Sequence, residues 1–129
     1  MLTVQELMKE IEEKGGLTPA KKIRETAERF PEMVAMREKN FGIWEETTYS
    51  QYWEQAQWVG CALDYYGIDR QDSVAIHSEN RPEWFIADVG IQSIGAISVG
   101  LYPTNPPAEV QYLIGHSESK ILFAEDQEQ

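Results

Sequence analysis

The stretch that decides the fold is "SVAIHSENRPEWFIADVGIQSIGAISVGLY", residues 73–102. It contains a short apolar run at 73–77, a helix-like segment from Asn80 to about Ile94, and a second apolar run at 96–102. Apolar runs separated by about 10–15 helix-like residues are typical of parallel strands joined by right-handed crossovers. We therefore predict that the two runs are neighbouring parallel strands of one sheet.

The alternation continues beyond this stretch. Residues 107–117, which begin with the second of two adjacent prolines, have helical character. "KILFA" at 120–124 is a third apolar run. The whole segment from 73 to 124 thus predicts a β-α-β-α-β sheet. The fold class that follows is α/β.

The helix predicted at 80–94 has unusual sequence features. Asn80 is expected to cap it, Pro82 needs no hydrogen-bond donor in the first turn, and Glu83 suits the positive end of the helix dipole. Its apolar residues surround nearly the whole helix, which predicts burial on several sides. Because a short chain has little protein with which to cover such a helix, we expect part of the cover to lie outside it.

The residues before the sheet are predicted to form three helices and a β-hairpin. Thr3 with Glu6 and Thr48 with Gln51 form capping boxes for the first and third helices. The expected order is a helix ended by Gly15-Gly16, a helix from Thr18-Pro19 to Phe30, a hairpin of 33–38 and 43–49, and a helix to about Tyr66. The double glycine makes residues 1–16 a mobile N-terminal helix and 17–129 the α/β subdomain proper.

Composition limits the function classes. The chain has 129 residues, enough for one domain, and its 22 acidic against 11 basic residues give a net charge of −11. This charge argues against unaided binding to nucleic acid or to anionic membrane. No apolar run approaches the roughly 20 residues of a transmembrane helix, and the acidic N-terminus does not resemble a signal peptide. A cytoplasmic protein is expected.

Motifs for chemistry are absent from the sequence. It has neither GxGxxG nor GxxxxGK[ST], and His77 and His116 are too isolated to predict a metal site. The single cysteine, Cys61, lies between Gly60 and Ala62 in a helical segment, which predicts a buried thiol rather than a nucleophile. The seven aromatic residues between Trp44 and Tyr66 are expected to form core and subdomain contacts. No catalytic residue follows from spacing alone.

The loop "YPTNPP" at 102–107 directly follows the second predicted strand. Ligands of open parallel sheets collect beyond the carboxyl ends of the strands. Pro106 and Pro107 fix the entry into the next helix at little entropic cost. From the residues alone, a loop that shapes a ligand site and a rigid loop without a ligand are equally favoured.

Four blocks together carry a resemblance to a known family. They are "TYSQYW" (48–53), "DSVAIHSENRPEW" (72–84), "GAISVGLYPTNPPAEVQYLIGHSE" (95–118) and "KILFAED" (120–126). From about residue 18 to its end, the chain resembles the N-terminal subdomain of the adenylate-forming (AMP-binding) acyl-CoA synthetases. Within that superfamily, "NRPEW" and "LYPTNPPAEVQYLIGHSESK" are most similar to the long-chain fatty acid–CoA ligases.

The resemblance implies an activity for a longer enzyme. Such enzymes join a carboxylate to ATP with Mg²⁺, release pyrophosphate, and pass the acyl group to coenzyme A. The family's phosphate loop, its aromatic-Thr-Glu motif, its ribose-binding Asp and its C-terminal lysine lie further along a longer chain and do not occur here. The resemblance therefore implies an N-terminal portion that is inactive alone, with a fatty acid as substrate of the full-length enzyme and a location peripheral to a membrane.

The resemblance also implies site residues. In related synthetases the loop after the "GAISVG"-like strand lies near the coenzyme A nucleotide, which corresponds here to Tyr102, Pro103 and Thr104. The chain departs from acetyl-type members, which carry Gly where it has Pro103 and Thr104. Two alternatives remain: another adenylate-forming ligase, for aryl or amino acids, and a non-catalytic flavodoxin-like interaction domain. We also expect the isolated chain to self-associate as a homo-oligomer, because the 84–94 helix and the 102–107 loop would present apolar surface. Exchange of the first helix about the Gly15-Gly16 hinge is one expected route.

Overall fold

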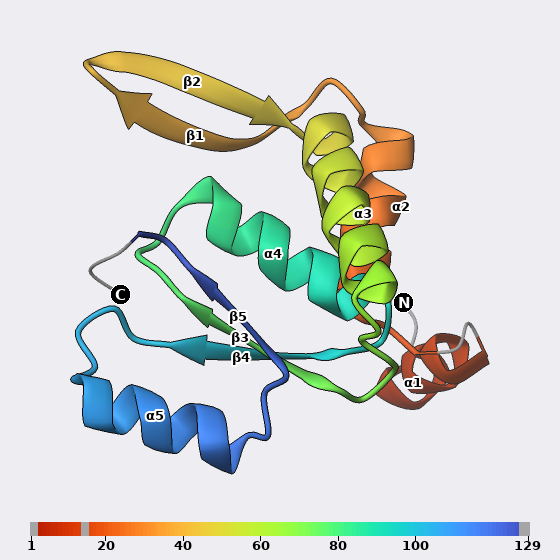
Figure 1. Ribbon diagram of the computed structural model, residues 1–129. Coiled ribbons are helices and arrows are strands. Elements are labelled where there is room, and N and C mark those ends of the chain that lie inside the picture. The colour runs from red at the N-terminus through yellow and green to blue at the C-terminus, as the bar shows by residue number, and fades with distance from the viewer. Residues whose placement is uncertain (1–2, 14–15, 127–129) are drawn as a thin grey trace.

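The computed structural model describes residues 3–13 and 16–126 (Figure 1). The described elements follow the predicted order. They are α1 (Val4–Glu13), α2 (Pro19–Arg29), β1 (Val34–Asn40), β2 (Ile43–Thr48), α3 (Tyr49–Tyr65), β3 (Ser73–His77), α4 (Pro82–Ser93), β4 (Ile97–Leu101), α5 (Pro107–His116) and β5 (Ile121–Ala124).

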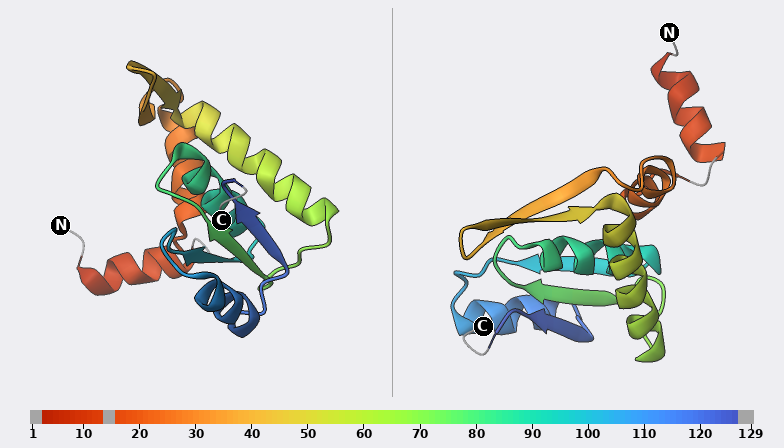
Figure 2. Two further views of the ribbon diagram at one scale, coloured as in Figure 1. Left: turned by 60° about the vertical axis from the view of Figure 1, so that its left-hand side comes forward. Right: turned by 90° about the horizontal axis from the view of Figure 1, so that it is seen from above.

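The parallel sheet is confirmed. Its strand order is β4-β3-β5, with β3 parallel to both neighbours. Register places Ala75 of β3 beside Val99 of β4 and Leu122 of β5. The antiparallel pair β1 and β2 forms a separate two-stranded sheet. All three parallel strands therefore end at one edge of the sheet, on the same side of the molecule as the hairpin turn (Figures 1 and 2).

Helix α4 lies at the centre of the fold, between the parallel sheet and the helices α2 and α3 (Figure 2). Two apolar clusters meet it from opposite sides. The sheet-side cluster is Leu63, Ile68, Val74, Ile76, Ala87, Ile91 and Ala96. The helix-side cluster is Ala20, Tyr52, Ala56, Ile86 and Val89. The expected burial of α4 is thus confirmed for its central residues, and the chain itself supplies most of their cover. Phe85 of α4 is nevertheless exposed, so the expectation that part of the cover lies outside the chain stays a prediction.

The core forms because α3 and α4 approach each other through glycines. A Cβ atom added to Gly90 of α4 would lie 2.6 Å from Cβ of Val59 and 2.8 Å from the carbonyl oxygen of Ala56. A Cβ atom added to Gly60 of α3 would lie 2.7 Å from Oγ of Ser93. Contacts this short do not occur between real side chains, so these glycines set the distance between the two helices.

Helix starts agree with the predicted capping boxes at two positions and differ at one. Thr48 Oγ1 accepts from the Gln51 amide, and the Thr48 amide donates to Gln51 Oε1 at 2.9 Å. Thr3 and Glu6 make the same exchange. The expectation that Asn80 caps α4 is wrong, because the N-cap is Arg81. A residue before proline is driven to extended backbone, and Arg81 (φ −123°, ψ 162°) takes that conformation ahead of Pro82.

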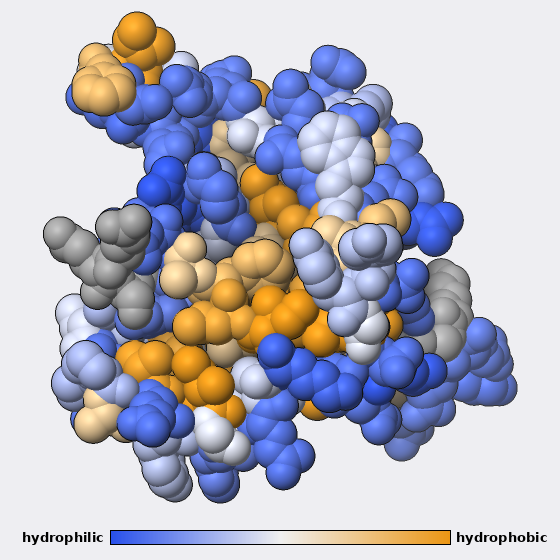
Figure 3. All heavy atoms as spheres, viewed as in Figure 1, coloured by the Kyte–Doolittle hydropathy of each residue, from blue (hydrophilic) through white to orange (hydrophobic). Residues whose placement is uncertain are grey.

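The second face of the sheet is less covered. Helix α5 lies on that side, yet none of its residues is buried, and Ile97 and Leu122 of the sheet are exposed. Apolar side chains gather across the middle of the face viewed in Figure 3. The uncovered apolar surface therefore includes Ile97 and Leu122 on this sheet face, and on α4 only its first turn, where Phe85 is exposed. Self-association of the chain stays a prediction, although its expected surface is mostly buried.

Several single-residue expectations are corrected along α3. Cys61 is exposed rather than buried. Of the aromatic residues expected to form core and subdomain contacts, Tyr52 is buried and its hydroxyl donates to the Phe85 carbonyl at 3.1 Å. Trp44, Trp58, Tyr65 and Tyr66 are exposed and so are not part of the core, while subdomain contacts of these four stay a prediction. Gly15 lies outside the described residues, whereas Gly16 has a φ of +80° and its amide donates to the Ile11 carbonyl.

Replacing Gly90 by Ala should destabilise the chain. The added Cβ forces α3 and α4 apart, and such overpacking costs about 1–3 kcal/mol, more than the roughly 1 kcal/mol that Ala gains over Gly in a helix. Thermal unfolding followed by circular dichroism measures the effect. Gly115→Ala on α5 is the matched control, since nothing lies within 4 Å of its added Cβ. A Gly90→Ala variant as stable as Gly115→Ala would contradict the proposed helix contact.

Candidate functional site

The candidate site lies at the carboxyl edge of the parallel sheet, where β3, β4 and β5 end together. An open pocket of about 300 Å³ lies there between the ends of β3 and β5 and the start of α4. Its apolar lining includes Ile76, Trp84 and Phe123, and its polar lining includes Arg81 and Glu125. The chain thus forms an amphipathic hollow at the edge where ligands of parallel sheets collect.

Glu125 cross-links the two strand ends beside this pocket. One carboxylate oxygen accepts from Nη1 of Arg81 at 2.8 Å, and the other accepts from the Glu79 amide at 2.9 Å and from Ser78 Oγ at 3.2 Å. The Arg81 guanidinium, followed by the Glu79 amide, lowers the pKa of the Glu125 carboxyl. Arg81 also contacts Glu83, so two carboxylates flank its charge. This arrangement disfavours an anionic ligand such as a triphosphate at Arg81.

The loop at 102–107 is held by His77, the last residue of β3. The His77 side chain is buried, and its Nε2 lies 3.1 Å from the Tyr102 carbonyl oxygen, to which the imidazole N–H donates. The backbone N–H of Asn105 donates to the same carbonyl at 3.0 Å. The side-chain amide of Asn105 also donates to Glu109 in the first turn of α5, at 2.7 Å. The loop is therefore fixed to the central strand and to the following helix.

The three sequence-predicted site residues lie on this loop. The Tyr102 side chain is 78% exposed, Thr104 is exposed and Pro103 is half-buried. The hydrogen bonds to its carbonyl thus fix the backbone of Tyr102, while its phenol ring is open to solvent and available to stack on a planar group. The loop begins and ends where the sequence predicts, with α5 starting at Pro107.

Sequence reasoning missed the two residues that hold the edge together, His77 and Glu125. For His77, the sequence offered one signal of a role at this edge: it is a polar residue at the end of an apolar strand. Glu125 directly follows β5, but its partners Ser78, Glu79 and Arg81 are more than forty positions away, so only the sheet topology pairs them. Long-range polar contacts of this kind leave no local pattern.

Other candidate chemistry is not assembled in the part of the chain that the structure describes. Across residues 3–13 and 16–126, no group of three His, Cys, Asp or Glu side chains could hold a metal ion. His116 stacks on Tyr112 within α5, away from His77. Among the described helices, none is long and apolar enough to span a bilayer.

The profile of the AMP-binding enzyme family matches residues 23–129. The chain belongs to this family. The matched range contains the whole parallel sheet, the pocket and the loop at 102–107. The α/β fold described above is that of the N-terminal subdomain of adenylate-forming enzymes, as the solved structures below also indicate.

Several curated relatives of this AMP-binding chain are named as long-chain-fatty-acid–CoA ligases. A Xenopus laevis long-chain-fatty-acid–CoA ligase, ACSBG2, is 34% identical over 106 residues, which are 82% of this chain and 14% of that protein. Its Homo sapiens counterpart is 36% identical over 106 residues, 82% of this chain and 16% of that protein. The Drosophila melanogaster ligase heimdall is 28% identical over 110 residues. The chain spans about one sixth or less of the length of the relatives that it matches.

Two solved structures of adenylate-forming proteins share the fold. The Klebsiella oxytoca NpsA N-terminal subdomain, in complex with 3-hydroxyanthranilyl-AMSN, has a TM-score of 0.76 and 24% identity, covering 84% of this chain and 27% of that one. A fatty acyl-adenylate ligase from Legionella pneumophila, in complex with acyl adenylate and pyrophosphate, has a TM-score of 0.76 and 21% identity, covering 81% and 19%. At these identities the likeness shows the fold alone.

The Glu125 cross-link should make stability depend on pH. Because the pKa of Glu125 is lowered from its ordinary value of 4.5, its contacts stabilise the folded chain above about pH 4.5. That stabilisation is lost as the pH falls through the lower, folded-state pKa. Glu125→Gln should therefore melt at a lower temperature than the parent at pH 7, and the difference should narrow between pH 4.5 and pH 3.

Thermal melts across this pH range measure the effect. The pKa of Asp72 is also lowered, chiefly by Lys120, but both proteins contain this pair, so its contribution cancels in the difference. Glu54→Gln, on the exposed face of α3, is the matched control and should follow the parent at every pH. A constant difference between Glu125→Gln and the parent from pH 7 to pH 3 would contradict the assigned role.

Proposed function

We propose that this chain is the N-terminal portion of an ATP-dependent, AMP-forming long-chain fatty acyl-CoA synthetase. The observation that carries the proposal is the shared name of the relatives: those that are 34–36% identical over 104–106 residues are long-chain-fatty-acid–CoA ligases. The range that the family profile matches, 23–129, includes the sheet and its carboxyl edge, which is the part that could adjoin a ligand. The substrate is then a long-chain fatty acid.

The proposed reaction uses ATP and coenzyme A, with Mg²⁺ to neutralise phosphate charge. The described residues do not suit the metal, since no carboxylate group gathers as a ligand set. They do not suit the ATP phosphates either, because Arg81 is already paired with Glu83 and Glu125. We assign adenylation to other segments of a synthetase, and we expect the chain alone to show no fatty-acid-dependent pyrophosphate exchange.

The residues do suit a part in binding coenzyme A. We assign Tyr102, Pro103 and Thr104 to the coenzyme A entrance, with the exposed ring of Tyr102 stacking on the adenine. His77 keeps this ring at the edge by holding the Tyr102 backbone.

We propose 17–129 as the subdomain and 1–16 as a mobile helix attached to it, in a cytoplasmic enzyme that works peripherally on membranes. No observation favours the ligase for aryl or amino acids or the non-catalytic domain.

A chimera tests the proposed function. The aligned segment of the Homo sapiens ACSBG2 ligase is replaced by this chain, and formation of palmitoyl-CoA from palmitate, ATP and coenzyme A is measured. If the segment serves the same reaction, the chimera should keep activity within about tenfold of the parent ligase. A folded chimera, judged by an unchanged melting temperature, that makes no acyl-adenylate or acyl-CoA from any carboxylate would refute the proposal.

In an active chimera, Tyr102→Ala should raise KM for coenzyme A and leave KM for ATP unchanged. Removing one stacked ring costs about 1–3 kcal/mol, or about fivefold to more than a hundredfold in KM. Tyr112→Ala is the matched control, because Tyr112 is similarly exposed but lies on α5, outside the loop. Equal effects of Tyr102→Ala on the two KM values would remove Tyr102 from the coenzyme A entrance.

A further inference from the structure

The turn of the β1–β2 hairpin carries an apolar tip that nothing in the core explains. Phe41 is 99% exposed, Ile43 is 70% exposed and Trp44 is 62% exposed. In Figure 3 an apolar group stands at the hairpin turn, at the upper left, separated from the central apolar surface by hydrophilic residues. Three large apolar side chains on one turn are a cost to the isolated chain, because they stay in water.

The backbone of the tip adds a second cost. Phe41 (φ +47°) and Gly42 (φ +85°) both have positive φ, as the two central residues of a type I′ hairpin turn require. Gly adopts this conformation readily, and Asn or Asp tolerates it at the first position, whereas a bulky aromatic residue there is uncommon. A strained position that also exposes an aromatic ring indicates a function for that ring.

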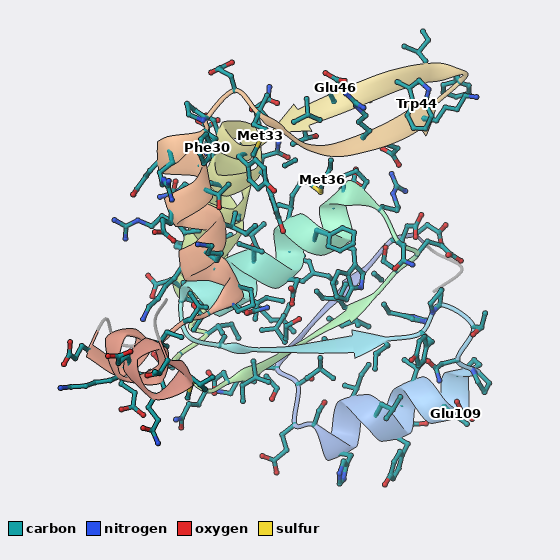
Figure 4. The ribbon with its side chains drawn as sticks, turned by 180° about the vertical axis from the view of Figure 1, so that it is seen from behind. Phe30, Met33, Met36, Trp44, Glu46 and Glu109 are labelled. Carbon is teal, nitrogen blue, oxygen red and sulfur yellow. The ribbon has the colours of Figure 1, made fainter. Side chains whose placement is uncertain are left out.

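Behind the tip, the hairpin is polar and its base is fixed. Arg37 Nε donates to Glu46 Oε1 at 2.8 Å, and Lys39 Nζ lies 5.9 Å from the centre of the Trp44 ring. Met36 packs against the helix-side cluster, so the base is attached to the body while Trp44 lies further out toward the turn (Figure 4). The result is a short arm with a polar shaft and an apolar end.

We propose that this tip, defined as Phe41, Ile43 and Trp44, inserts into the interfacial region of a zwitterionic lipid bilayer. A specific protein interface usually needs about 20–30 residues a side, far more than the tip offers. A few aromatic and aliphatic side chains are enough for shallow insertion, and Trp favours the interface because its ring is apolar and its N–H polar. Lys39, beside Trp44, can extend its ammonium to the headgroups.

Charge decides which lipid suits the tip. The chain has a net charge of −11, which repels an anionic surface. The shaft does not reverse this repulsion, since Glu38, Glu45 and Glu46 outnumber Arg37 and Lys39. The tip therefore matches phosphatidylcholine better than phosphatidylserine. The inference deepens the peripheral membrane location proposed above but does not rest on the proposed reaction. Vesicle binding is measured without substrate, so the inference can fail while acyl-CoA formation by the chimera holds.

Flotation with phosphatidylcholine vesicles tests the inference. The parent chain should float with the vesicles, and Ile43→Ser and Trp44→Ser should each weaken binding about tenfold. Trp58→Ser is the matched control, because Trp58 on α3 is 63% exposed but lies outside the tip. Vesicles containing phosphatidylserine should bind the chain more weakly at low salt, with recovery as salt is raised.

Phe41→Asn separates lipid binding from folding. Asn-Gly is the preferred type I′ pair, so this variant should melt at the same temperature as the parent or higher, yet bind vesicles about tenfold more weakly. Phosphatidylcholine brominated near the headgroup should quench tryptophan fluorescence in the parent, and this quenching should largely disappear in Trp44→Phe.

Three results would overturn the proposal. The first is no flotation of the parent at millimolar phosphatidylcholine. The second is an equal loss of binding in Trp58→Ser and Trp44→Ser. The third is a blue shift of the parent's tryptophan fluorescence that rises with protein concentration in the absence of lipid and is missing in Trp44→Phe, together with an equal loss of this shift and of vesicle binding when lipid and protein compete. That result would assign the tip to contact with a second copy of the chain.

Discussion

The close contact between α3 and α4 is the constraint on which the rest of the structure depends. Gly60 and Gly90 let the two helices approach until a single added carbon would clash with the facing helix. Each glycine costs about 1 kcal/mol of helix propensity. The approach offsets this cost by burying side chains such as Ile86, Val89 and Ile91, each worth about 1.5–3 kcal/mol. Without it, α4 could not contact α3 and the sheet at once.

From this packing follows the placement of the carboxyl edge. Helix α4 covers β3 and starts beside the ends of β3 and β5, so Arg81 at its N-terminus lies within reach of Glu125. On the opposite face, His77 of the same central strand holds the loop that carries Tyr102. The two cross-links fix the edge from both faces of β3. A buried helix pair therefore determines where an exposed loop presents its side chains, although neither helix contributes to that loop.

The order of elements and the parallel sheet could be predicted from the sequence, because helices and strands each give a local pattern. That pattern is the spacing of apolar residues and the length of each apolar run. The capping boxes at Thr3 and Thr48 are local too. Asn80 failed as a cap because the backbone restriction before Pro82 outweighed a side-chain preference. Cys61 was misjudged because small neighbours indicate close packing somewhere on a helix but not on which face. The Glu125 cross-link was out of reach because it depends on strand order, which brings together residues distant in sequence.

The cover of α4 shows a more general limit of sequence patterns. An all-round apolar helix indicates how much of its surface is buried, not what buries it. Here α2, α3 and the sheet cover the centre of α4 and leave Phe85 in its first turn exposed. Apolar surface left over also includes the second sheet face, where α5 buries none of its own residues and Ile97 and Leu122 are exposed. That face spans several strands, whereas the hairpin tip is small, strained and flanked by charged residues. The two features call for different partners: a broad face suits another folded segment, and an isolated tip suits a fluid one such as lipid. The strain at Phe41 separates them, because no packing argument within the chain requires an aromatic ring in that turn.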